Sequence, residues 1–193
     1  MNALKQAIMS RGKAIGTDII KVDMFLNHRI DTALLAEMGN EFARRFKDDR
    51  VDTILTIEAS GIAVAVTVAQ ALGNVPIVFA KKGETRNVNG EMYTAKVYSF
   101  THQKENTIRV CREYLNPESR VLIIDDFLAN GEAVQGLISL CRQAGAEVVG
   151  VGICVEKGYQ PGGKRLREAG LHVESLAIVD AVEDGKIILR EDD

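Results

Sequence analysis

The sequence predicts an α/β fold in which helices flank a mostly parallel central sheet on both faces. Two observations lead to this fold class. Short apolar runs typical of buried strands alternate with longer stretches of helical periodicity, and such alternation builds parallel sheets. The 193 residues, of which 46% are hydrophobic, suffice for one full core and are short for two. No repeat, low-complexity tract or linker divides the chain, so we expect one domain over residues 1–193.

The clearest helical pattern runs from Asp31 to about Phe46. Asp31 has a side chain suited to an N-cap. Apolar residues at three- and four-residue steps share one face of this helix: Leu34, Leu35, Met38, Phe42 and Phe46. A predicted strand from Val51 to Ile57 then ends at Glu58, and an Ala-rich stretch from Ile62 to Leu72 predicts a buried helix that Gly73 ends.

The second half of the chain repeats this alternation. The expected elements are a strand from Pro76 to Ala80, a strand from Val121 to Ile124, a helix from about Glu132 to Gln143 ended by Gly145, and a strand from Val148 to Val155. The stretch from Gly83 to Gly90 lacks periodicity, which predicts a mobile loop, either a lid over a site or a solvated connector. Met92 to Phe100 is rich in β-branched and aromatic residues and predicts the strand that returns from it, as half of a hairpin.

The run from Val121 to Ala133 gives the strongest functional signal. Four apolar residues lead into Asp125 and Asp126, and a turn of small residues leads into a helix that begins near Gly131. The N–H groups of a helix N-terminus favour a phosphate, whereas two carboxylates favour hydroxyls or a hydrated metal. These requirements together describe a sugar phosphate; the alternative is a purely structural turn with an acidic helix cap. Neither the Gly-x-Gly-x-x-Gly dinucleotide fingerprint nor a P-loop occurs in the sequence.

Three further polar clusters follow predicted strands, and ligands of parallel sheets bind beyond the carboxyl ends of the strands. They are Glu58 to Gly61, Ala80 to Lys82, and Glu156 with Lys157. We therefore expect all four clusters at one edge of the sheet.

Composition restricts the class of partner. A net charge of −3 provides no general field for nucleic acid or an anionic membrane. There is no apolar run near 18 residues and no signal pattern at the N-terminus, so we expect a soluble cytoplasmic protein. Cys111, Cys141 and Cys154 are odd in number and widely spaced, which favours reduced, buried thiols over disulfides or a metal site.

The segment from Val121 to Ala133 resembles the 5-phosphoribosyl 1-pyrophosphate (PRPP) motif of the type I phosphoribosyltransferases. Four other segments stand in the order and spacing of the bacterial xanthine branch of that family: Lys21 to His28, Thr56 to Ala63, Val97 to Phe100, and Glu156 to Gly162. The similarity extends from Ala3 to about Ile188. It implies a central sheet with a mobile loop and a small hood, formed by about residues 1–30 and the C-terminal part.

The resemblance implies transfer of a phosphoribosyl group from PRPP to xanthine, with release of pyrophosphate, in purine salvage. The 5-phosphate would bind the loop and helix start formed by Ala129, Asn130, Gly131, Glu132 and Ala133. Asn130 stands where Thr is frequent, and Glu132 would have to point away from the phosphate. Asp125 and Asp126 resemble the acidic pair that holds the ribose hydroxyls, and they are also able to reach Mg²⁺ through water.

For the pyrophosphate, Ser60 and Gly61 resemble the family's pyrophosphate loop, where small residues let main-chain N–H groups approach. Ser60 is alternatively only a cap for a helix at Ile62. Lys81, Lys82 and Arg86 are candidates to close over the same charge, with Lys81 the first choice.

For the purine, Lys157 is a cation suited to the 2-oxo group, and Asn27 donates and accepts hydrogen bonds. Phe127 is suited to stacking on the base or to the core, and the family's hood places the segment around Ile20 over the base. The resemblance implies Mg²⁺ bound with PRPP and a homodimer. The alternatives left open are a phosphoribosyltransferase for guanine, hypoxanthine or adenine, and a PRPP-binding regulator.

Overall fold

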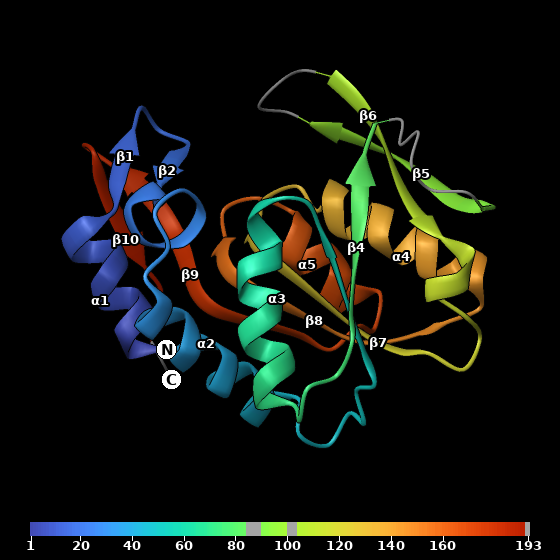
Figure 1. Cartoon of the computed structure of the whole chain (residues 1–193). Coiled ribbons are helices and arrows are strands. Elements are labelled where there is room, and N and C mark those ends of the chain that lie inside the picture. The colour runs from blue at the N-terminus through green and yellow to red at the C-terminus, as the bar shows by residue number, and fades with distance from the viewer. Residues whose placement is uncertain (84–89, 100–103, 192–193) are drawn as a thin grey trace.

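The computed structural model describes residues 1–83, 90–99 and 104–191, and in that part of the chain one large sheet organises the molecule (Figure 1). Its eight described strands lie in the order β10-β9-β8-β7-β3-β4-β6-β5. The five central strands are parallel: β9 (Val173–Glu183), β8 (Glu147–Lys157), β7 (Arg120–Leu128), β3 (Thr53–Ile57) and β4 (Ile77–Lys82). Antiparallel strands complete both edges: β10 (Lys186–Leu189) on one, β6 (Lys104–Cys111) and β5 (Met92–Ser99) on the other.

Helices cover both faces of this sheet, which confirms the predicted fold class. The helices are α1 (Asn2–Arg11), α2 (Thr32–Arg45), α3 (Ser60–Ala71), α4 (Glu132–Ala144) and α5 (Gly162–Glu168). Alternate residues of β7 enter two separate cores: Leu122 and Ile124 pack with α1, α2 and α3, whereas Val121 and Ile123 pack with α4 and α5.

The predicted elements occur with modest shifts of their ends. The Asp31 side chain accepts a hydrogen bond from the Leu34 amide at 3.2 Å, so the predicted N-cap of α2 is confirmed. Gly145 ends α4 in a left-handed conformation with φ +73°, as predicted. The strand predicted from Met92 occurs as β5 and is half of a hairpin, but its partner is the following strand β6, paired from Met92 with Cys111 to Ser99 with Lys104, because β6 lies between β5 and β4.

Residues 1–31, here called the N-terminal segment, lie together with β10 at one end of the sheet (Figure 1). Besides α1, the segment contains a two-stranded hairpin of β1 (Lys13–Ile15) and β2 (Ile19–Lys21) and a π-helical turn, η1 (Asp23–Asn27). A 3₁₀ turn, η2 (Arg112–Tyr114), follows β6 at the other end of the sheet. None of the described helices is long and apolar enough to cross a membrane.

Candidate active site

Two adjacent carboxylates lie buried near the end of β7. Asp125 and Asp126 are 4% and 7% exposed, and the Asp126 amide donates to Asp125 Oδ1 at 3.0 Å. Burial, and after it the negative charge of Asp126, raises the pKa of the Asp125 carboxyl well above its ordinary value. A buried acidic pair of this kind favours a ligand that brings hydroxyl donors or positive charge.

The chain turns sharply between the acidic pair and α4. Gly131 has φ +90°. Gly162 of α5 approaches the turn so closely that a Cβ on Gly162 would lie 2.3 Å from the Ala129 carbonyl oxygen. The Gly162 amide donates to that carbonyl at 3.1 Å, so the turn is held from the α5 side. No side chain in the described part of the chain caps α4, and the amides of Glu132 and Ala133 at its first turn remain available to an anion, with Asn130 beside them.

A second helix N-terminus lies beside the same carboxylates. A Cβ on Gly61 would lie 2.1 Å from the buried Thr56 hydroxyl and 3.4 Å from Asp125 Oδ1, so only glycine fits where α3 meets the acidic pair. The helix begins at Ser60 with Ala59 at its N-cap and no side-chain cap, so the alternative in which Ser60 caps a helix at Ile62 is wrong. The Glu58 side chain instead accepts from the Lys82 amide and joins the ends of β3 and β4.

The N-terminal segment reaches this site through Asn27. Its Nδ2 donates to Asp126 Oδ2 at 3.1 Å, a hydrogen bond between residues 99 positions apart. Ile20 is 7% exposed and belongs to the core that α1, α2 and α3 share, and the half-buried Phe127 packs against the same core. The structure thus brings Asn27 to the acidic pair and gives Phe127 a packing role.

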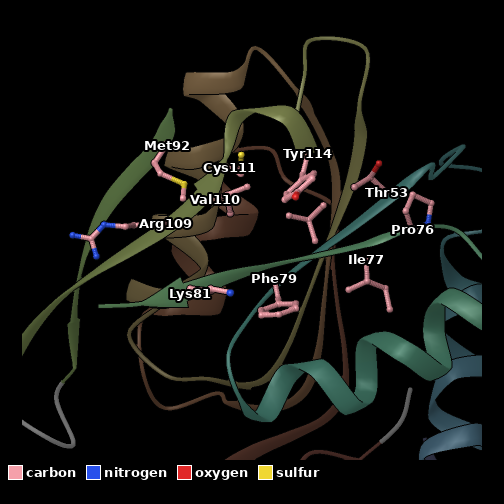
Figure 2. A pocket seen from close by; sticks show the side chains of 11 residues that line it. Thr53, Pro76, Ile77, Phe79, Lys81, Met92, Arg109, Val110, Cys111 and Tyr114 are labelled. Carbon is pink, nitrogen blue, oxygen red and sulfur yellow. The ribbon is translucent and has the colours of Figure 1, made fainter. Parts of the chain in front are cut away.

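The side chains of Lys81 and Lys82, at the end of β4, lie in different surroundings. Lys81 lines an apolar cavity of about 520 Å³ between β4 and the diverging end of β6, with its ammonium 5.9 Å from the Phe79 ring centroid (Figure 2). Of the predicted site residues that the structure describes, Lys81 alone lines this cavity. Lys82, not Lys81, is the lysine whose positive charge counteracts the raised pKa of Asp125. The structure therefore does not place Lys81 with the acidic pair.

Lys157 ends β8 and is held by a residue that the sequence analysis missed. Its ammonium donates to the Asp18 carbonyl at 2.7 Å, in the turn between β1 and β2. Tyr159 and Gln160 also donate to Asp18. The only sequence signal was the segment from Glu156 to Gly162 in the family resemblance, which assigned no partner to these side chains. Arg86 and the centre of the predicted lid lie outside the described residues.

A mostly parallel sheet thus carries two open helix N-termini around a buried acidic pair, all at the carboxyl ends of its strands, where the ligands of such sheets bind and where helix N-termini favour phosphate. Residues 23–169, more than half of the chain, match the model of the phosphoribosyl transferase domain family. The chain belongs to this family.

Relatives and solved structures agree with that assignment. The chain is 53% identical over 191 residues to a xanthine phosphoribosyltransferase of Ruminiclostridium cellulolyticum, covering 99% of this chain and 100% of the relative. It is 50% identical over 190 residues to one of Clostridioides difficile, covering 98% and 100%. The adenine phosphoribosyltransferase of Giardia lamblia, solved with 9-deazaadenine, superimposes with a TM-score of 0.75 at 23% identity, over 91% of this chain and 96% of that one, and shares the fold.

Proposed function

We propose that this phosphoribosyltransferase transfers the 5-phosphoribosyl group of PRPP to xanthine, giving xanthosine 5′-monophosphate and pyrophosphate in purine salvage. The observation that carries the proposal is the hydrogen bond from Asn27 to Asp126, which joins the segment expected to cover the base to the carboxylates expected to hold the ribose. The names of relatives at 50% identity or more over nearly the whole chain support xanthine as the base.

The ribose 5-phosphate binds the turn and first helical residues formed by Ala129, Asn130, Gly131, Glu132 and Ala133. Main-chain N–H groups and the helix dipole bind it, and the Glu132 side chain points away. Asp125 and Asp126 accept hydrogen bonds from the ribose hydroxyls and place negative potential beside C1 as it becomes cationic. Because that potential acts most strongly when the cation develops, it lowers the barrier more than it tightens substrate binding.

The departing pyrophosphate binds the amides of Ser60 and Gly61 at the start of α3. Lys82 adds positive charge at the same edge, since its charge already acts on Asp125. Lys81 lines the cavity beside Phe79. It contributes to pyrophosphate binding only if the β4 wall of that cavity is part of the substrate-bound site.

Xanthine stacks on the part of Phe127 that the core leaves exposed, beneath the N-terminal segment, which is the hood, and Ile20 borders the base from the core side. Lys157 donates to the 2-oxo group, and Asn27 offers an amide to the base while it holds Asp126.

The acidic pair fits Mg²⁺ that arrives with PRPP. Among residues 1–83, 90–99 and 104–191 no three metal-ligating side chains converge, so a site made only of protein ligands is not formed there. Two buried carboxylates, one with a raised pKa, suit a cation that keeps water and substrate oxygens as most of its ligands. Mg²⁺ supplies charge neutralisation of the pyrophosphate when it is bound.

Purified protein assayed with PRPP, Mg²⁺ and a panel of xanthine, guanine, hypoxanthine and adenine tests the proposal. We expect the highest kcat/KM for xanthine. If the enzyme prefers another base, that base is the substrate in place of xanthine. If no base gives a nucleotide product, the alternative of a PRPP-binding regulator is favoured. In a Lys157→Ala variant, kcat/KM for xanthine should fall by about tenfold or more, with a much smaller change in the KM for PRPP.

We further propose a single domain that works as a homodimer in the cytoplasm. Phe79 and Tyr114, which are 38% and 59% exposed, flank the apolar cavity, and a second copy of the chain would bury them. Three buried free cysteines suit a reducing compartment. Light scattering should give twice the chain mass of 21.1 kDa, and a Phe79→Asp variant should give the chain mass. A monomeric wild type contradicts the dimer.

A further inference from the structure

One residue of the hood receives hydrogen bonds from three side chains at the end of β8. Asp18 lies in the turn between β1 and β2, and its carboxylate accepts from Gln160 Nε2 at 2.7 Å and from the Tyr159 hydroxyl at 3.2 Å. Its carbonyl accepts from Lys157 Nζ at 2.7 Å, and that ammonium lies 3.4 Å from the Asp18 carboxylate.

The three donors are themselves held in a tight turn. The main-chain amide of Gln160 donates to the Lys157 carbonyl at 2.9 Å, which closes the turn. Gly158 lets the backbone of the turn lie close to Ile178 on β9. The turn therefore presents Lys157, Tyr159 and Gln160 as one unit toward the hood. Gln160 Oε1 is buried and has no partner in the described part of the chain, so the unit retains a free acceptor.

These contacts fix the ammonium of Lys157 in a defined direction. The Lys157 side chain is only 15% exposed, and among the described residues Asp18 provides both of its acceptor oxygens. A lysine ammonium has three N–H donors. Two face Asp18, which leaves one for a further acceptor, and the Asp18 carboxylate balances the positive charge.

We infer that Asp18 is a positioning residue for Lys157: it closes the hood hairpin onto the end of β8 and aims the remaining N–H donor of Lys157 at the exocyclic oxygen of the base. The inference rests on the proposed function, because the acceptor it assigns is the 2-oxo group of xanthine. In this role Asp18 affects the base through Lys157, and its hydrogen bonds to Lys157, Tyr159 and Gln160 include neither member of the acidic pair.

A double-mutant cycle tests this role. Asp18→Ala, Lys157→Ala and the double variant are compared with the wild type by measuring KM for xanthine at saturating PRPP, and KM for PRPP at saturating xanthine. Asp18→Asn keeps the size of the side chain while removing its charge. Asp184→Asn is the matched control, because Asp184 is an exposed acid in the turn between β9 and β10. Thermal unfolding shows whether each variant is folded.

Asp18→Ala keeps the main-chain carbonyl that accepts from Lys157 and removes the carboxylate that holds Gln160, Tyr159 and the ammonium. We therefore expect it to raise KM for xanthine by about threefold to tenfold and to leave KM for PRPP within about twofold. Asp18→Asn should give a smaller rise in the same parameter, and Asp184→Asn no change. In the Lys157→Ala background, Asp18→Ala should add less than about a twofold effect, because the residue through which it acts is gone.

Three results would overturn the inference: unchanged kinetics in both Asp18 variants, equal rises in both KM values, or fully additive effects in the cycle. If Asp18→Ala does not fold, the same readouts from Asp18→Asn decide. A wild-type enzyme that makes no nucleotide from xanthine overturns the proposed function itself, whereas an active enzyme with unaffected Asp18 variants overturns only this inference.

Discussion

At the scale of single residues, the site places charges where folding alone would disfavour them. Asp125 is buried beside Asp126, and its raised pKa means that the folded protein holds a proton there more tightly than the unfolded chain does. Ionisation of Asp125 therefore costs stability as the pH rises from the ordinary value of 3.8 towards the raised one, and the full cost remains above it. We attribute this stability cost to the ligand-binding role of Asp125, because a ligand that brings hydroxyl groups or a cation offsets it.

An Asp125→Asn variant should accordingly be more stable and less active. The amide oxygen still accepts from the Asp126 amide, while the unfavourable charge is removed. We expect the free energy of unfolding of the ligand-free protein at pH 8 to rise by about 1–2 kcal/mol, with a smaller gain at pH 5. Urea unfolding at both pH values, with Asp184→Asn as the control for a lost surface charge, measures this. A gain independent of pH, or a loss at pH 8, contradicts it.

Glu156, which is 3% exposed, shows the opposite balance. Burial raises its pKa, but hydrogen bonds from Arg167 at 2.8 and 2.7 Å, and from Ser175, outweigh burial and leave the pKa below its ordinary value. The pair therefore contributes stability above the pKa of the unfolded glutamate, and this contribution is lost as the pH falls through the lowered value.

Replacing Arg167 should reverse the pH dependence of the stability that Glu156 contributes. Arg167→Ala leaves a buried carboxylate without its charged partner, so we expect a loss of about 2 kcal/mol at pH 7.5; the figure lies below that for a fully buried pair because the Arg167 side chain is 38% exposed. The loss should shrink towards pH 4.5, where Glu156 takes up a proton. Arg165→Ala, in the same helix, is the control. Equal stability of the two variants at pH 7.5 would contradict the role of the pair.

At the scale of elements, the junction between β3 and α3 determines where the amides that we propose for pyrophosphate binding lie. The Thr56 hydroxyl is buried without a partner in the described part of the chain, directly beneath Gly61. Any side chain at position 61 must displace either that hydroxyl or the start of the helix, and the helix start lies beside Asp125.

A Gly61→Ala variant should therefore lose both stability and PRPP binding. We expect a destabilisation of about 1–3 kcal/mol from overpacking, together with a raised KM for PRPP. In a Thr56→Ala background the added methyl group gains space, so the stability loss caused by Gly61→Ala should become smaller. Thermal unfolding and PRPP kinetics of the single and double variants test this. A Gly61→Ala protein that matches the wild type in both would show that the junction has room.

The elements also show what the sequence was able to predict. Periodicity and caps were sufficient for α2 and α4, because Asp31 and Gly145 act locally. The strand predicted to end at Ile124 extends to Leu128, since pairing with β8 through Glu156 overrides the low strand propensity of two aspartates. No prediction was made for α1, the hairpin β1–β2, α5, β9 and β10. The hairpin and β10 are short, and their stability comes from packing at the end of the sheet.

The candidate site was predictable to the extent that it follows from strand ends. Asp125, Asp126 and the turn to α4 stand in one continuous segment, so a single pattern indicated them. The contact between Asn27 and Asp126 spans 99 positions, and only the family resemblance pointed to Asn27. Lys81 and Lys82 are neighbours on a strand, where adjacent side chains face opposite ways, and the predicted strand ended at Ala80 before the facing of either lysine was determined.

At the scale of the whole molecule, three separate parts of the chain meet at the site: the hood, the start of α3, and the segment that carries the acidic pair and the start of α4. A ligand that bridges them should stabilise all of them together. In the proposed complex PRPP touches both α3 and α4, and Mg²⁺ neutralises the pyrophosphate beside the two carboxylates. The free energy of unfolding should therefore depend on both components jointly.

Thermal unfolding with and without ligands measures this coupling. At about 100 times the dissociation constant, PRPP with Mg²⁺ should stabilise the protein by about 2.7 kcal/mol, which for a chain of this length corresponds to a rise in Tm of about 5–10 °C. PRPP in the presence of a chelator, or Mg²⁺ alone, should give much smaller rises. The Asp125→Asn variant starts from a higher Tm and should gain less from the complete ligand, since it has one carboxylate fewer to satisfy. An equal rise with chelator present would show that PRPP binds without the metal.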